Sequence, residues 1–549
     1  MKHLLWALLG TAAGMATAGK VRRRVQLSRA KQRGLVGHAR MAKRAARLVP
    51  NYAFDEEQFF AADGAPPEIV TRRREGFGQL AALHRSRFAK TAAYTADIAD
   101  GIPDLRFTGA YRVPFQFSPV VREHLAAGSF YQAAHGVMLT DLDGNEFYDL
   151  TGSYGVNLLG VDAYRAMIAQ GVELVADLGP TLAGLHPVAA DNVRRLQALS
   201  GLDAVSFHMS GTEAVMQAVR LARYHTGRTH LVRFAGAYHG WWDDVQPGVG
   251  NPMPADRTYS LADMSERSLA VIASRKDIAC VLVNPLQALH PNRNAPGDGT
   301  LMAQRVNAGA GREAYADWLQ RLAETCRKAG VVLIMDEIFT GFRLAPRGAC
   351  EYFGVAPDMI TYGKTLGGGL PVGVLCGKAA LMKRYREDRP ADICFARGTF
   401  NSHPYVMGAM NAFLRHMETD GARSLYHGMD DRWRRRAEAL NARLEAEGLP
   451  VRIANLGTIW TVCYNQPGRY HWMLQYYLRA QGLALSWVGT GRLIFSLAYS
   501  DEDFSAVADR FLAAARAMRD DGWWWLSEGD AGKALRGRVV REMLHHALR

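Results

Sequence analysis

The stretch that most constrains the fold spans residues 331–373 and reads VVLIMDEIFTGFRLAPRGACEYFGVAPDMITYGKTLGGGLPVG. Its first apolar run ends at Asp336, and its second ends at Tyr362 and leads into Lys364 and a glycine cluster. Continuous apolar runs of this kind predict buried strands, each followed by a loop. In α/β folds, the loops at the carboxyl ends of such strands carry the chemistry, so we expect Asp336 and Lys364 to belong to the functional site.

An aspartate and a lysine at two strand ends are the groups that pyridoxal 5'-phosphate (PLP) requires of a protein. The lysine amine forms a Schiff base, and the carboxylate holds the protonated pyridine nitrogen. On this pair alone, two structural interpretations stay open, a solvated loop lysine at Lys364 and a helix cap at Asp336-Glu337. A Walker phosphate loop is excluded, because that motif needs glycine five residues before the Gly-Lys pair, where this chain has Asp358.

Several longer motifs support the PLP interpretation. DEIFTGFR and GVAPDMITYGKTLGGGLPVG resemble the signature of class III (fold-type I) PLP-dependent aminotransferases, with the closest likeness to the glutamate-1-semialdehyde aminomutase branch. Further motifs follow in the family's order: DLDGNEFYDLTGSYGVNLLG, SGTEAVMQAVRLAR, YHG, RGTFNSHP and FSLAYSDEDF. The resemblance covers residues 107–517 and implies an α/β fold with a mostly parallel central sheet and a smaller α+β C-terminal domain. It also implies ping-pong transfer of an amino group from a small amino donor to a carbonyl acceptor.

The resemblance assigns roles to residues around the cofactor. Lys364 forms the Schiff base and then moves the substrate's α-proton, for which its amine must be neutral. Asp336 pairs with the pyridine nitrogen, and Ile338 packs on the ring. Tyr238, in the Tyr-His-Gly motif, stacks on the opposite ring face, while His239 either forms a hydrogen bond nearby or is structural.

The cofactor's phosphate is assigned to Ser210, Gly211 and Thr212, where a strand meets a helix. Free backbone N–H groups and the positive end of the helix dipole suit a phosphate dianion at such a place. The alternative is a capping box without a ligand, formed by Ser210 and Glu213. Thr399 resembles the threonine with which a second subunit reaches the phosphate, which implies a homodimer with shared active sites.

The chain also departs from the family pattern. Asn284 replaces a glutamate beside the cofactor, and Phe339 replaces a glutamine that holds the ring hydroxyl, a role for which Gln287 is a substitute candidate. Arg122 resembles the aminomutase arginine that binds a substrate carboxylate but is displaced by one residue, and Tyr154 occupies the position of an aromatic over the substrate.

We therefore expect an aminotransferase. An aminomutase, which moves nitrogen within one substrate, is the nearest alternative, and the displaced arginine and the altered cofactor surroundings weaken it. A membrane-tethered, non-catalytic scaffold on the same fold is an alternative of another class. The complete set of Lys364, Asp336 and the Ser-Gly-Thr segment disfavours the scaffold.

Charge is concentrated at the N-terminus. Residues 1–54 carry twelve of the 66 Lys/Arg residues and no Asp/Glu, which leaves 54 basic against 53 acidic residues in the body. A near-neutral body disfavours a nucleic-acid surface. The apolar residues 3–19 are consistent with a secretory signal, a short membrane anchor or a surface-lying helix, and the basic residues 20–24 argue against export. We expect membrane contact with the catalytic body in the cytoplasm; a disordered arm and a targeting peptide stay open.

The distribution of charge, apolar stretches and motifs along the chain predicts five segments. They are a basic membrane-contact segment (1–54), a helical extension (55–106), a PLP-binding large domain (107–429), a small C-terminal domain (430–520) and a basic helical tail (521–549). Six cysteines without a CxxC pair exclude a zinc ribbon, so we predict buried thiols and no metal site.

Overall fold

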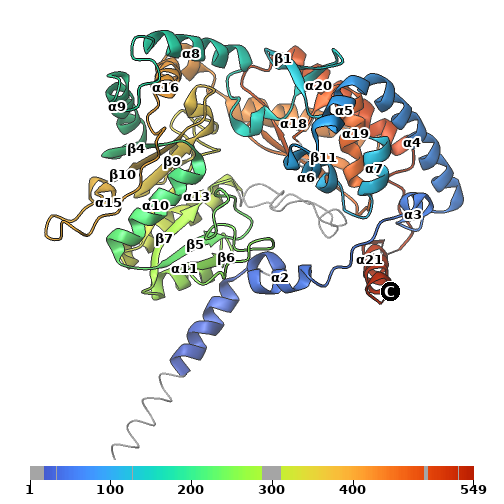
Figure 1. The fold of residues 1–549 in the computed structure, drawn as a ribbon. Helices are drawn as coiled ribbons and strands as arrows, with labels where there is room; N and C mark the ends of the chain where they lie inside the picture. The colour runs from blue at the N-terminus through green and yellow to red at the C-terminus, as the bar shows by residue number, and fades with distance from the viewer. Residues whose placement is uncertain are drawn as a thin grey trace, which may run out of the picture.

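The computed structural model describes residues 18–32, 34–126, 128–286, 311–486, 492–529 and 531–548. Its centre is a seven-stranded sheet with the order β4-β10-β9-β8-β7-β5-β6 (Figure 1). In chain order, these strands are β4 (Ala204–His208), β5 (His230–Phe234), β6 (Thr258–Leu261), β7 (Ile278–Val283), β8 (Val332–Asp336), β9 (Met359–Gly363) and β10 (Gly373–Gly377). β10 is antiparallel to both of its neighbours, and the pairs from β9 through β8, β7 and β5 to β6 are parallel, which confirms the predicted mostly parallel sheet.

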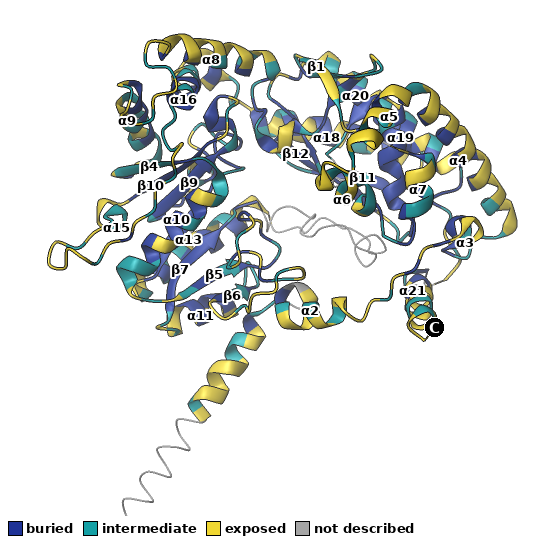
Figure 2. Cartoon of the chain, viewed as in Figure 1, coloured by how far each residue is buried: buried dark blue, intermediate teal, exposed yellow. Residues whose placement is uncertain are grey.

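Helices cover both faces of this sheet, and for that reason β7, β8 and β9 are buried along their whole length (Figure 2). One face packs against α10, and the other contributes to a core with α9, α11, α13 and α16. The helices of this domain are α8 (Val161–Leu174), α9 (Val188–Ser200), α10 (Gly211–Thr226), α11 (Glu266–Ser274), α13 (Arg312–Ala329), α14 (Ala349–Phe353), α15 (Ala379–Met382), α16 (Pro404–Met417) and α17 (Asp420–Ser424), with the 3-10 turns η2 (Gly152–Gly155) and η3 (Lys364–Gly367).

The C-terminal part forms a smaller unit around the antiparallel sheet β11 (Val451–Leu456), β12 (Ile459–Tyr464) and β14 (Arg492–Ile494). It also contains α18 (Met429–Ala446), η4 (His471–Met473), α19 (Leu474–Ala480) and α20 (Asp501–Asp520). A second sheet consists of β1 (Tyr131–His135), β2 (Met138–Asp141), β3 (Glu146–Asp149) and β13 (Leu483–Ala484). β2 and β3 form the hairpin that the Asp-Gly pair predicts.

The helical extension packs against this smaller unit. It comprises α3 (Glu56–Ala61), α4 (Pro67–Arg87), α5 (Ala89–Ile98) and α6 (Pro103–Tyr111), followed by α7 (Ser118–His124). Phe59 and Phe77 share one aromatic core with Trp523. Within it, buried Arg73 forms a 2.7 Å ion pair with Asp63. Breaking such a buried pair costs about 3–5 kcal/mol. The Arg73 Nε also donates to the Gly522 carbonyl at 3.0 Å, so the same guanidinium connects the extension to the body.

The C-terminal helix lies against the body, whereas the N-terminal helix projects from it and contacts it near its own C-terminal end (Figure 1). Residues 18–30 form a helix, followed by η1 (Leu35–Gly37) and α2 (Ala39–Ala46), and largely exposed residues line both helices (Figure 2). The predicted tail helix is α21 (Ala531–Ala547), held by the Arg469–Glu542 ion pair. None of the helices in the described ranges is long and apolar enough to cross a membrane. Residues 3–17 of the apolar N-terminal stretch lie outside the described residues.

Candidate active site

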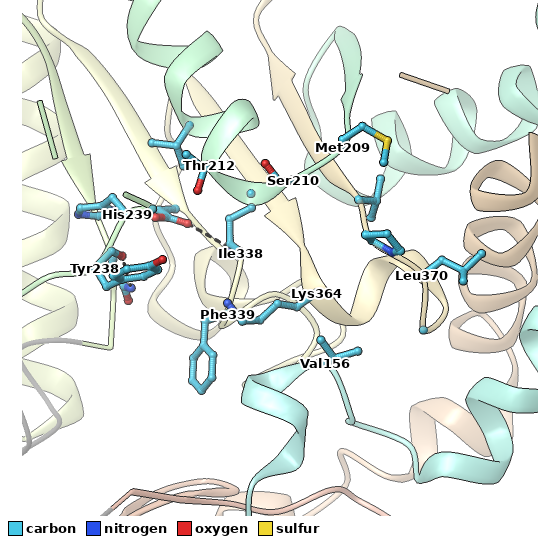
Figure 3. Close-up of a pocket in the computed structure, with 18 residues that line it drawn as sticks. Val156, Met209, Ser210, Thr212, Tyr238, His239, Ile338, Phe339, Lys364 and Leu370 are labelled. Carbon is cyan, nitrogen blue, oxygen red and sulfur yellow. Dashed lines mark hydrogen bonds and ion pairs between the residues drawn. The ribbon is translucent and has the colours of Figure 1, made fainter. Parts of the chain in front are cut away.

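The candidate active site is a cavity of about 440 Å³ at the carboxyl ends of β8 and β9 and the N-terminus of α10. Figure 3 shows Ser210 and Thr212 on one side of this cavity and Lys364 on the other, with Ile338 between them. The residues expected at the site that line it are Ser210, Gly211, Thr212, Tyr238, His239, Asp336, Ile338 and Lys364.

Lys364 directly follows β9 and begins η3 with a φ of 45°, in the left-handed region that a non-glycine residue rarely adopts. Burial lowers the pKa of its amine, while the charge of Asp336 acts in the opposite direction. The amine lies 5.5 Å from the centre of the Phe339 ring and has no hydrogen-bond partner among the described residues. The site therefore favours the neutral, reactive form of this lysine.

Asp336 is the last residue of β8, and its carboxylate is buried and held in one orientation. Oδ2 lies 2.7 Å from Nδ1 of His239, and Oδ1 accepts from the Ile338 N–H at 3.2 Å and from the Thr361 hydroxyl at 3.4 Å. Burial lowers the pKa of His239, so the neutral ring donates its Nδ1–H to the carboxylate. His239 thus positions Asp336, which resolves the alternative left open for this histidine.

The start of α10 contains half of the predicted capping box. The Ser210 hydroxyl accepts from the Glu213 N–H at 3.2 Å, but the Glu213 carboxylate accepts from the Met209 N–H instead of that of Ser210. Gly211 must lack a side chain, because a Cβ there would come within 2.8 Å of Ile338. The first-turn N–H groups, which have no carbonyl partner inside the helix, thus remain next to the cavity.

Asn284, at the position where the family has a glutamate, holds the backbone of two neighbouring segments through its side chain. Its Nδ2 donates to the Tyr238 carbonyl at 3.3 Å, and its Oδ1 accepts from the Leu286 N–H. The Tyr238 ring lines the cavity but is 56% exposed. Gln287, the candidate for the ring hydroxyl, lies outside the described residues.

Two further residues of the DEIFTGFR motif, Glu337 and Arg343, have defined roles, and that of Arg343 was not predicted from the sequence. The buried Glu337 carboxylate accepts from the N–H groups of Ala349 and Cys350, at 2.6 and 2.7 Å, and so caps α14. The helix-cap interpretation therefore holds for Glu337 and not for Asp336. The signal in the sequence was a second carboxylate directly after the strand.

Arg343 is buried and connects three parts of the chain. Its guanidinium donates to the carbonyl oxygens of Gly155 and Asn157 around η2 and to the Phe495 carbonyl and Thr458 hydroxyl of the smaller unit, at 2.9–3.2 Å. Burial lowers its pKa to about 10, so it stays charged at neutral pH. Since η2 packs on Phe339 and Lys364, Arg343 fixes the wall of the cavity next to the lysine.

A second cavity, of about 580 Å³, is lined in part by Ser153 and Tyr154 of η2. Arg122 is exposed on α7 and lines neither cavity, so the structure does not bring it to the site. Arg112 and Arg479 line the second cavity instead, and burial lowers the pKa of Arg112. The Arg112 guanidinium has no hydrogen-bond or ion-pair partner in the part of the chain that the structure describes. No local pattern marks this arginine in the sequence.

Thr399 is exposed and does not line the cavity of its own chain. Close to it, Phe395 and Phe400 are 70% and 53% exposed. The structure thus leaves Thr399 on a surface with apolar side chains.

Comparison with known proteins gives consistent matches. The family model described as aminotransferase class-III matches residues 120–515. A glutamate-1-semialdehyde 2,1-aminomutase from Nitratidesulfovibrio vulgaris (strain DP4) is 33% identical over 399 residues, covering 69% of this chain and 90% of the relative. A solved structure described as a transaminase with PLP bound is 25% identical, with a TM-score of 0.58 and coverage of 71% of this chain and 92% of that one. A glutamate-1-semialdehyde aminomutase structure from Pseudomonas aeruginosa PAO1 shares the fold, with 21% identity, a TM-score of 0.64 and coverage of 82% and 99%.

The opposing effects on Lys364 predict how an Asp336→Asn substitution acts. The Asp336 charge raises the lysine pKa against the effect of burial, so the substitution should lower that pKa further. The rate at which cofactor-free protein forms a covalent adduct with added PLP should then reach half of its maximum at a lower pH than in the wild type. Asp358→Asn, at the opposite end of β9, is the matched control and should leave this midpoint in place. An unchanged or higher midpoint for Asp336→Asn would contradict the coupling.

Proposed function

Because this chain belongs to the class III aminotransferase family, we propose that it is a PLP-dependent aminotransferase in which Lys364 carries the cofactor. The observation that supports this most is the buried lysine amine, without a partner in the described chain, facing the same cavity as the oriented carboxylate of Asp336. When bound, PLP supplies an electron sink for the carbanion formed at the substrate's α-carbon.

The residues that line the cavity fit this cofactor in chemistry and order. Asp336, oriented by His239, would hold the protonated pyridine nitrogen, and the first turn of α10 would hold the phosphate. Ile338 and Tyr238 would cover the two ring faces. In its neutral form, the Lys364 amine would accept the substrate's α-proton and then donate it to another atom. The lowered pKa of the amine supports this role.

Two reactions use this machinery, and we propose transfer between separate donor and acceptor molecules. The aminomutase alternative is supported by the relative at 33% identity. The departures at Asn284 and Phe339, and the exposed position of Arg122, favour the aminotransferase.

The stoichiometry of a half-reaction distinguishes the two. PLP-loaded enzyme given an amino donor alone should convert about one equivalent per site and then stop, and a carbonyl acceptor should restart it, as ping-pong chemistry requires. The measurement is product formed per subunit in a single-turnover assay across a panel of amines and amino acids. Catalytic turnover of an amino-aldehyde substrate without any second substrate would favour the aminomutase.

We also propose that Arg112 binds a carboxylate of the substrate. Its guanidinium lacks an ionic partner among the described residues, lies partly buried, and lines the cavity that Tyr154 shares. A second guanidinium, that of Arg479, lines the same cavity and lies 4.9 and 5.0 Å from the ring centres of Phe88 and Phe147. Such a site suits amino acids or keto acids whose carboxylate lies away from the reacting amine.

Arg112→Met should raise KM for carboxylate-bearing substrates on the order of ten- to a hundredfold, because a hydrogen bond to a charged group contributes about 1.5–3 kcal/mol. KM for amines without a carboxylate should change little. Arg122→Met, which removes the exposed arginine, is the matched control and should leave both KM values near the wild type. A larger effect at Arg122 than at Arg112 would restore the assignment made from the sequence.

A homodimer with shared sites is a further part of the proposal. The exposed Thr399, the half-exposed Tyr238 and the neighbouring exposed aromatic residues Trp241, Phe395 and Phe400 support a second copy covering this side of the cavity. Thr399 would then reach the phosphate of the partner's cofactor.

The proposal also includes membrane contact through the N-terminal arm, by which we mean the helix of residues 18–30 together with η1 and α2. The helix of residues 18–30 and α2 combine basic side chains with exposed Val21, Val25 and Met41. Each basic residue near an anionic surface contributes about 1 kcal/mol of attraction. The arm would thus hold the enzyme at a membrane surface.

A further inference from the structure

The N-terminal arm does not hang free of the catalytic body. Ala30 is fully buried, and its carbonyl accepts from the Ala262 N–H at 2.9 Å, directly after the edge strand β6. Arg275 and Gln26 add side-chain hydrogen bonds between the arm and the region of α11. These contacts hold the C-terminal end of the helix of residues 18–30 beside the edge of the sheet.

A cavity of about 510 Å³ lies between the arm and β6. It shares no residue with the active-site cavity. The arm contributes five basic side chains to its lining, and the body contributes mainly small or hydroxyl-bearing residues of β6. The basic residues are Arg24, Lys31, His38, Arg40 and Arg44.

The charges in this cavity are poorly balanced. Asp256 pairs with Arg40 at 2.9 Å, and both side chains of that pair are exposed. Arg24, Lys31 and Arg44 have no carboxylate partner among the described residues. Of the other carboxylates close to β6, Asp244 pairs with Arg223, while Asp277 accepts from the Tyr259 hydroxyl at 2.6 Å and lies 3.8 Å from Arg275.

The pKa of Lys31 reflects the same excess of positive charge. Its side chain is half-buried, and both burial and the positive charge of Arg40 lower its pKa. An anion in the cavity would reverse the repulsion and stabilise the charged lysine.

We propose that this cavity is a phosphate-binding site, in which Lys31, Arg24 and Arg44 bind the dianion of a phosphate monoester. Arginine offers paired N–H donors that match phosphate oxygens, and lysine adds a compact charge. Ser260 of β6 also lines the cavity and would supply a neutral hydroxyl donor. A soluble phosphate ester and the headgroup of phosphatidic acid carry this same group. This site is independent of the reaction proposed for the active site.

The test uses the PLP-loaded, full-length protein, so that the phosphate site of the cofactor is already filled. Inorganic phosphate and glycerol 3-phosphate are titrated calorimetrically at constant ionic strength, with chloride as the compensating ion. Lys31→Gln/Arg44→Gln removes two charges from the cavity, and Arg22→Gln/Arg29→Gln removes two exposed charges of the same arm outside it. Thermal unfolding without phosphate checks that both variants fold.

We expect the cavity variant to weaken phosphate binding at least tenfold and the control variant to change it less than twofold. Flotation with phosphatidylcholine vesicles, with and without phosphatidic acid, identifies the source. If only the cavity variant loses flotation, the site binds the lipid headgroup. If both variants float equally and only the cavity variant loses phosphate binding, the site binds a soluble ester. Equal effects of both variants on phosphate binding, or no binding by the wild type, would overturn the proposal.

Discussion

The parallel pairing of β8 and β9 is the constraint on which the site depends. Asp336, at the end of β8, is opposite Thr361 of β9, and β9 continues for two more residues before Lys364. The register therefore delivers a carboxylate and an amine to one cavity without relying on a flexible loop. Because helices cover both faces of the sheet, the amine is also desolvated, and its pKa falls for that reason.

The surroundings of this pair are held by polar groups with defined partners. His239 fixes the Asp336 carboxylate, and Glu337 caps α14 directly after β8. Arg343 is bonded to four neutral oxygens, two around η2 and two in the smaller unit. Its hydrogen bonds join the cavity wall beside Lys364 to the C-terminal sheet. Movement of the smaller unit would therefore displace this wall next to the reacting lysine.

Much of this architecture was predictable from the sequence, because it follows from local patterns. Apolar runs predicted β8 and β9, and the Asp-Gly pair predicted the β2–β3 hairpin. Arg112 was not found, since its importance arises from a cavity formed by segments distant in the chain. The same holds for the docking of the helical extension on Trp523 and for the arm on β6, which depend on long-range packing that no local motif records.

Identification of the lysine that carries the cofactor tests the central claim most directly. PLP-loaded protein is reduced with borohydride and digested, and the modified peptide is sequenced by mass spectrometry, with Lys364→Ala treated in parallel. The account predicts that the label lies on Lys364 in the wild type and is absent from the variant, which should keep its fold but lose amino transfer. A label on another lysine, or amino transfer by the variant near the wild-type rate, would contradict it.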